Sequence, residues 1–183
     1  AGDDLVVNGT YDLQANMLAG PGNVLLQAGS QMTISTASLK QLQNASITNN
    51  GSINWQDGNI RFDAPNSTLI NNGTFTISGN NTSFFNGGRL SITNNAAFTK
   101  TSTGTSNVAG ILLFFNAGTL NCNGGNFVFG DNNAGGIFTN LATGTVILNN
   151  GNFTSGTSTT FNNNSGASIH GNGVFNFTSV FNN

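Results

Sequence analysis

The chain has 183 residues, and only 5% of them are charged, against about 25% in ordinary domains. Its net charge of −2 provides neither the basic surface that nucleic acid binds nor a polybasic patch for anionic lipid. Hydrophobic residues make up 37% and include 15 Phe, so the composition also argues against intrinsic disorder. No stretch approaches the roughly 20 apolar residues of a membrane span. We therefore expect a single domain over residues 1–183, without nucleic-acid binding or membrane insertion.

Residues 1–23 are expected to form an N-terminal strand or partial coil followed by a loop. Residues 5–13 alternate like a strand around an Asn8-Gly9 turn, and Gly20-Pro21-Gly22 indicates a loop. The start, Ala1-Gly2-Asp3-Asp4, is interpreted as a mature end left by cleavage after a small residue or as an arbitrary boundary. With no Glu and little Lys, this composition favours a secreted protein at the cell surface.

Residues 24–183 repeat one short pattern: an apolar residue, then Asn and a tight turn, then a second apolar residue. The clearest copy is Ile47-Thr48-Asn49-Asn50-Gly51-Ser52-Ile53. An earlier copy, residues 24–29, has Gln27 in the Asn place. The copies are 22 to 24 residues apart and begin at Ile47, Leu69, Ile92, Phe114, Phe138 and Phe161. A repeat of this length predicts a solenoid.

A second apolar cluster follows within each period, and its alternation predicts a strand with one face inward. Its members are Ile60, Phe62, Phe84, Phe85, Phe127, Phe129, Phe153, Phe175 and Phe177. Gly and Asn clusters separate the segments, as tight turns require. Each period thus has room for about three short strands and three turns. The one faintly helical stretch, residues 35–45, is too short and too weakly periodic for a helix.

Short strands with this period are compatible with antiparallel hairpins or with a parallel β-helix. The constant spacing favours the helix, because equivalent positions of successive coils then lie directly over one another, ~4.8 Å apart. We predict an all-β fold: a right-handed parallel β-helix, or β-solenoid, of about eight coils with a period of about 22–24 residues.

The repeated Asn residues should form one column in such a stack. Its members are Asn49, Asn71, Asn94, Asn116, Asn140 and Asn162, or alternatively Asn163 beside it. The column has two interpretations: a row of ligands for sugar or ice, or an internal ladder in which each amide donates to the next coil. We favour the internal ladder, because it satisfies a buried turn.

Candidate catalytic residues are few. β-Helix enzymes that degrade pectin are the obvious comparison, and glycosidic chemistry requires paired carboxylates. Asp57 and Asp63 share one period with Arg61 between them, and Arg89 follows one coil later. Ordinary turn positions explain these carboxylates, and His170 is expected to face outward. We therefore predict that the protein is not an enzyme and has no catalytic residue and no cofactor.

Metal and ice binding are also disfavoured. A calcium-binding solenoid needs an Asp in each turn, and only Gly130-Asp131-Asn132 resembles one, so no metal site is predicted. Cys122 has no partner for a disulfide and is expected in the core. An ice-binding face would need outward Thr on every coil. In the place of Ser52 and Asn54, the following coils carry Thr74 and Thr76, Ala97 and Thr99, then Thr119 and Asn121.

Two phrases, residues 70–77 (INNGTFTI) and 146–153 (VILNNGNF), resemble repeats of secreted bacterial β-helix surface proteins. The similar proteins are adhesins of the filamentous-haemagglutinin and autotransporter-passenger type. The resemblance covers residues 24–183 and implies an extracellular, non-enzymatic role in surface structure or adhesion. It identifies no binding residue.

Both ends of the sequence are apolar strands without charged or helical caps, which solenoids in solution need. Either the chain is a piece of a longer surface protein, or copies stack head to tail into a filament. We favour an extracellular structural subunit that polymerises, with the interface formed by Leu5, Val7, Phe175, Phe177 and Phe181. The alternative is an adhesin segment that binds glycans or surfaces along one face. A polysaccharide-degrading enzyme and an ice-binding protein are less favoured.

Overall fold

The computed structural model describes residues 4–14, 16–19, 22–43, 46–63, 67–80, 82–86, 89–130, 135–178 and 180–183. Side chains are described for these residues except 16–19, 82–86, 89 and 111. In these ranges the chain forms 25 short β-strands and no helix, so the all-β prediction is confirmed. No helix long and apolar enough to cross a membrane occurs in this part of the chain.

The strands belong to three parallel sheets, here called A, B and C, which the chain visits in that order. Sheet A contains β1 (Leu5–Val7), β4 (Asn23–Leu26), β7 (Ser46–Asn49), β10 (Ser67–Asn71), β13 (Arg89–Asn94), β16 (Ile111–Asn116), β19 (Gly136–Asn140), β22 (Thr159–Asn163) and β25 (Val180–Asn182). Sheet B contains β2 (Thr10–Leu13), β5 (Gln31–Ile34), β8 (Ser52–Trp55), β11 (Thr74–Ile77), β14 (Ala97–Lys100), β17 (Thr119–Cys122), β20 (Thr145–Leu148) and β23 (Ser168–Gly171). Sheet C contains β3 (Asn16–Ala19), β6 (Lys40–Gln43), β9 (Asn59–Phe62), β12 (Thr82–Asn86), β15 (Thr105–Val108), β18 (Asn126–Phe129), β21 (Asn152–Ser155) and β24 (Phe175–Asn176).

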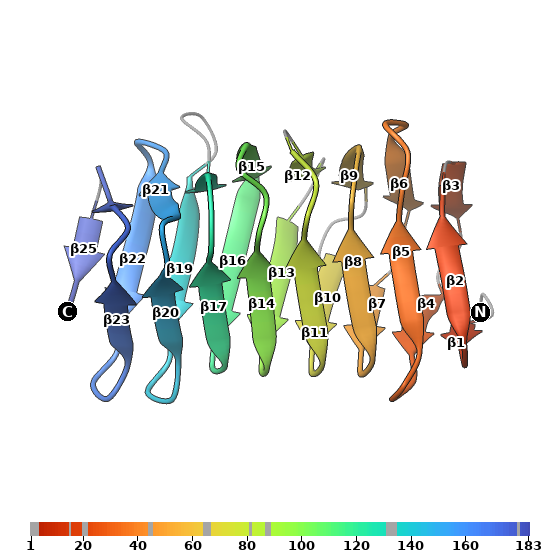
Figure 1. The fold of residues 1–183 in the computed structure, drawn as a ribbon, viewed down its shortest axis with the longest axis horizontal. Coiled ribbons are helices and arrows are strands. Elements are labelled where there is room, and N and C mark those ends of the chain that lie inside the picture. Colours follow the sequence, from red (N-terminus) through yellow and green to blue (C-terminus); the bar gives the residue numbers. More distant parts are fainter. Residues whose placement is uncertain are drawn as a thin grey trace.

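One strand from each sheet makes one coil, so that coil 1 is β1–β3 and coil 8 is β22–β24. Each strand pairs in parallel with the equivalent strand of the next coil; β10, for example, pairs with β7 on one side and β13 on the other. The chain rises through sheet B at the front of Figure 1 and returns behind it while advancing toward the C-terminus. The result is the predicted right-handed β-solenoid, in the handedness that parallel crossover connections favour.

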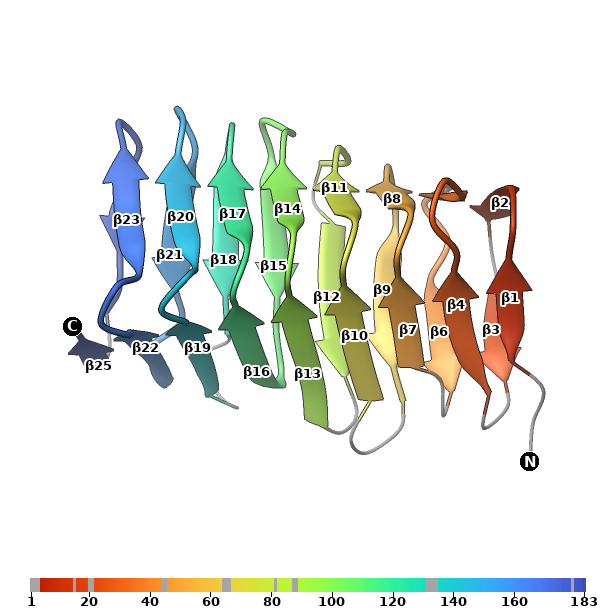
Figure 2. The same cartoon turned by 90° about the horizontal axis from the view of Figure 1, so that it is seen from below.

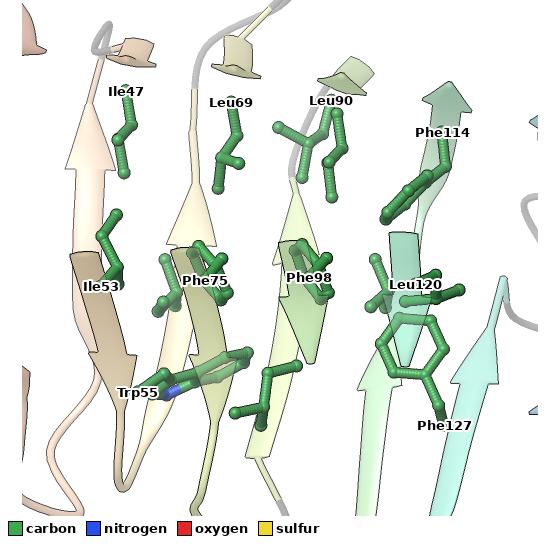
Figure 3. Packing of buried hydrophobic residues seen from close by; sticks show 14 of the residues in the cluster. Ile47, Ile53, Trp55, Leu69, Phe75, Leu90, Phe98, Phe114, Leu120 and Phe127 are labelled. Carbon is green, nitrogen blue, oxygen red and sulfur yellow. The ribbon is translucent and has the colours of Figure 1, made fainter. Parts of the chain in front are cut away.

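The interior is filled by alternate residues of all three sheets, as expected for strands with one buried face. The inward column of sheet A contains Ile47, Leu69 and Ile92, which are paired in register and at most 2% exposed. Sheet B supplies a second column in which Ile53, Phe75, Phe98 and Leu120 follow one another (Figure 3). Stacking therefore brings together residues about 22 positions apart and forms one continuous core.

The core changes character along the axis. In the sheet A column, aliphatic residues occupy the first five coils, whereas Phe114, Phe138 and Phe161 occupy the next three. Their rings stack in parallel with centroids 4.8 Å apart at both steps. Offset-stacked rings contribute about 0.5–1.5 kcal/mol per pair beyond burial. The C-terminal half is thus held by an aromatic ladder in addition to the backbone ladder.

The stretch 35–45, which was not expected to form a helix, contains β6. Two details differ from the sequence-based expectations. The loop expected within residues 1–23 contains β3, so coil 1 has all three strands. Leu26, and not Gln27, occupies the Asn place of coil 2, because Leu26 is paired with Asn49. In each case the neighbouring coil supplies a parallel partner strand, and this pairing outweighs the weak local pattern.

Candidate functional site

The Asn column lies at the corner between sheets A and B and is internal. Asn49, Asn71, Asn94, Asn116 and Asn140 are fully buried. The Nδ2 of each donates to the Oδ1 of the next member, over 2.7, 2.8, 2.8, 2.8 and 2.9 Å, the last bond reaching Asn163. Asn163, not Asn162, therefore continues the ladder, because it is paired in register with Asn140. Asn162 faces outward and accepts a hydrogen bond from Asn182.

Each ladder amide also holds the backbone of the following coil. Asn49 Nδ2 donates to the carbonyl of Thr74, and Asn71 Nδ2 to that of Ala97, both over 2.9 Å. Asn116 and Asn140 repeat this contact with the carbonyls of Thr145 and Ser168. With both amide protons engaged and the side chains fully buried, these amides are not accessible to an external ligand. The ladder fastens successive coils.

A second polar seam, which the sequence did not reveal, lies at the corner between sheets B and C. The buried ammonium of Lys100 donates to the Ser102 carbonyl at 2.5 Å, the Ser102 hydroxyl at 2.9 Å and the Gly124 carbonyl at 3.0 Å. Lys40, equally buried, donates to the carbonyls of Thr36 and Asp57. Burial lowers the pKa of both lysines.

Trp55, in the coil after that of Lys40, also donates to backbone carbonyls at this corner. Its Nε1 donates to the carbonyls of Asp57, at 3.1 Å, and Gly58, at 3.0 Å. Three different side chains thus satisfy inward-turned carbonyls at this corner. A signal for Lys100 was present in the sequence: it occupies the apolar column between Ile77 and Cys122, where a charged residue must find buried acceptors.

Cys122 lies in the core, as predicted, and is fully buried. Burial raises the pKa of its thiol to about 12. A thiol that stays protonated and inaccessible is a poor nucleophile and metal ligand. Cys122 therefore acts as a small apolar side chain.

The carboxylates considered for catalysis interact with residues close to them in the sequence. Asp63 forms a two-contact ion pair with Arg61, at 2.6 and 3.2 Å, while Asp57 accepts a hydrogen bond from the adjacent Gly58 N–H. The side chain of Arg89 and residue Asp131 lie outside the described residues. His170 is exposed on sheet B beside Ile147. No group of three or more His, Cys, Asp or Glu that could hold a metal occurs among the residues described.

The outer face of sheet B carries two columns of mostly uncharged polar residues in register. One runs through Thr10, Gln31, Ser52, Thr74, Ala97, Thr119, Thr145 and Ser168. The other runs through Asp12, Thr33, Asn54, Thr76, Thr99, Asn121, Ile147 and His170. The positions predicted to face outward are therefore aligned, but Ala, Asn and Ile interrupt the hydroxyl groups.

The two ends of the solenoid present strand edges and apolar side chains. Val174, Val180 and Phe181 on the C-terminal side are 55, 54 and 44% exposed. Of the residues predicted at an interface, Phe175, Phe177 and Leu5 are half-buried and pack against the core, while Val7 is 6% exposed. Since Val7 leaves little side-chain surface, an end-to-end contact would use mainly the free backbone edge of β1 and the half-buried residues.

No family model, curated protein or solved structure matches the chain. The class that the geometry defines is therefore architectural: a parallel β-solenoid with an internal asparagine ladder.

Proposed function

We propose that this protein is an extracellular structural subunit whose solenoid associates head to tail into a filament or surface fibre. The observation that carries the proposal is the distribution of exposed large apolar side chains. Among the described residues there are five, and three of them, Val174, Val180 and Phe181, belong to the C-terminal end. Two of them lie on the last strand, β25, and covering the apolar end around it with another copy, either on this strand or in its place, is favoured by about 25 cal/mol per Å² of apolar surface.

The polarity of the sheets supports the same association. All three sheets are parallel, so the edge at one end of the rod differs from the edge at the other and can pair with it in the same direction. A contact between unlike ends does not close on itself unless the rotation forms a ring, and repetition then gives a filament. The unpaired strand edges supply backbone donors and acceptors for this contact.

The proposal is tested by blocking one edge without disturbing the fold. Gln27 N–H donates to the Val7 carbonyl, so Val7 directs its backbone groups toward coil 2. Because these groups alternate along a strand, Val6 directs its own toward the free edge. Val6→Pro removes that free N–H while sparing the pairing of β1 with β4. Val6→Ala is the matched control.

Light scattering at increasing concentration and electron microscopy should show filaments for the wild type and Val6→Ala, and monomers for Val6→Pro. Circular dichroism should show the same β-structure in all three proteins. The proposal would be contradicted if the wild type remained monomeric at every concentration and variants with a weakened last strand did so too. Equal assembly of Val6→Pro and Val6→Ala would show that the association does not use this edge.

A second function, adhesion to neutral glycans, is favoured by the outer face of sheet B. Nine of its sixteen outward positions are Thr or Ser, and none of the outward positions from Thr33 to Ile147 carries a charged residue. Hydroxyl and amide groups can donate to and accept from sugar hydroxyls. Thr76→Lys with Thr99→Lys should abolish retention on immobilised neutral polysaccharide, whereas Thr48→Lys with Thr93→Lys, on the outer face of sheet A, should not.

A further inference from the structure

The three sheets do not contain equal numbers of strands. In the described part of the chain, sheet A has nine strands, whereas sheets B and C have eight each. The extra strand is β25, which lies beyond β22 at the C-terminal end (Figure 2). At this end the rod therefore has a step: sheet A extends one strand farther than sheets B and C.

This step conflicts with direct stacking of a second copy. If β2 and β3 of the second copy follow β23 and β24, its β1 falls on the position of β25, because β1, β2 and β3 belong to one coil. If its β1 instead follows β25, sheets B and C each lack one strand. A gap of ~4.8 Å then opens two sides of the core to water. Only the first arrangement closes all three sheets, and it requires β25 to leave.

The contacts of β25 are those of a replaceable strand. It has three residues, pairs only with β22 in the described structure, and exposes Val180 and Phe181. Its main side-chain contacts are the stacking of Phe181 on Phe161, at 5.5 Å, and an edge contact with Phe175, at 5.7 Å. Few apolar contacts and an exposed ladder are typical of segments that open locally at low cost.

β1 of a second copy fits the vacated place in register. In the columns of sheet A, Leu5 is equivalent to Phe181, so that it would cover Phe161. Displacement breaks the 2.7 Å hydrogen bond from Asn163 Nδ2 to Asn183 Oδ1. The other ladder amides also donate to the first residue of the following sheet B strand, as Asn140 does to the Ser168 carbonyl. In the second copy the equivalent acceptor is the Thr10 carbonyl.

We propose that β25 is a displaceable cap: it occupies the position that β1 of a second copy of this chain takes during end-to-end assembly. This inference rests on the filament proposed above. In the monomer β25 covers Phe161 and completes the asparagine ladder, and its release exposes a complete three-sided edge. Assembly is then limited by the opening of β25 as well as by encounter of two copies.

The test locks β25 in place in the 183-residue chain. Asn162 and Asn182 are register partners whose side chains meet at 2.8 Å on the outer surface, so Asn162→Cys with Asn182→Cys places two thiols in disulfide range. Cys122 is buried and does not compete. The same preparation is compared oxidised and reduced. In a second variant, Phe181→Ser removes the ring that stacks on Phe161.

Assembly is followed by light scattering and electron microscopy. The oxidised double variant should not assemble, and reduction should restore the wild-type rate. Phe181→Ser should assemble about tenfold faster, since it loses an aromatic pair that holds the cap closed. If the oxidised and reduced proteins assemble equally fast, the cap is refuted while the filament stands. If neither the wild type nor any variant assembles, the filament proposal fails, and the cap with it.

Discussion

At two inner corners of the solenoid, backbone carbonyls accept hydrogen bonds from side chains, and the two corners use different residue types. Between sheets A and B, one residue type, Asn, occupies the same place in six successive coils, and the first five of these amides donate to a backbone carbonyl of the next coil. Between sheets B and C, Lys40, Trp55 and Lys100 each serve a coil or two with different geometries. A repeated amide can bond to its own copy one coil away, whereas an ammonium can only donate. Asn is therefore propagated along the stack, and Lys is not.

The largest expected effect comes from breaking the amide ladder in its middle. Asn94→Ala deprives Asn71 Nδ2 of its acceptor and Asn116 Oδ1 of its donor. Each unsatisfied buried group costs about 1–3 kcal/mol, so the free energy of unfolding should fall by about 2–6 kcal/mol. Urea unfolding measures the change. Asn95→Ala, which removes an exposed amide bonded to Asn72, is the control and should cost under about 1 kcal/mol. Equal losses would contradict the importance of burial.

A smaller effect is expected for Trp55→Phe at the other corner. The change removes the donor to the Gly58 carbonyl, while the Asp57 carbonyl retains Lys40. The free energy of unfolding should fall by about 1–3 kcal/mol, because the half-buried Gly58 carbonyl loses its partner and a smaller ring replaces the fully buried indole. Thermal unfolding monitored by circular dichroism provides the measurement. An unchanged midpoint would show that water or a backbone shift satisfies this carbonyl.

Lys100→Met should change stability less at neutral pH, by at most about 1–2 kcal/mol, because the gain from removing a buried charge offsets the loss of the donor to the Ser102 and Gly124 carbonyls. The pH dependence is more informative. Burial lowers the pKa of Lys100 below 10.5, so the folded state disfavours the proton and the wild type gains stability as pH rises toward that value. As pH rises from neutral to alkaline, the unfolding free energy of the wild type should therefore increase relative to that of Lys100→Met. A flat difference would contradict this sign.

The smallest effect concerns Cys122, beside Lys100 in the same column. Its pKa rises from 9.0 to about 12, so its contribution to stability is complete below pH 9 and is lost as pH rises toward 12. At pH 8 the thiol should resist alkylation in the folded protein and react after denaturation, as mass spectrometry can measure. Rapid alkylation of the native protein would show that this part of the core opens to solvent.

The sequence by itself determined the architecture. The repeated pattern occurs in six regularly spaced copies that begin at residues from Ile47 to Phe161. Regular spacing requires equivalent residues to lie over one another, which only a parallel stack achieves. The same repetition predicted that the Asn residues form an internal ladder, since identical amides at one coil spacing can bond to one another. Its last member was uncertain, because Asn162 and Asn163 are adjacent and only the register of β22 on β19 selects Asn163.

Only the tertiary structure decided the features that do not repeat. Lys40 appears as an ordinary surface residue in the sequence, and Lys100 is distinguished only by its place in an apolar column. The carbonyls that accept hydrogen bonds from them are supplied by the turns of particular coils. Leu26 replaces Asn in coil 2, where pairing with Asn49 sets the register. The step formed by β25 also appears only once strands are assigned to sheets. Periodicity fixes what every coil shares, whereas the pairing of particular coils fixes how the corners and ends differ.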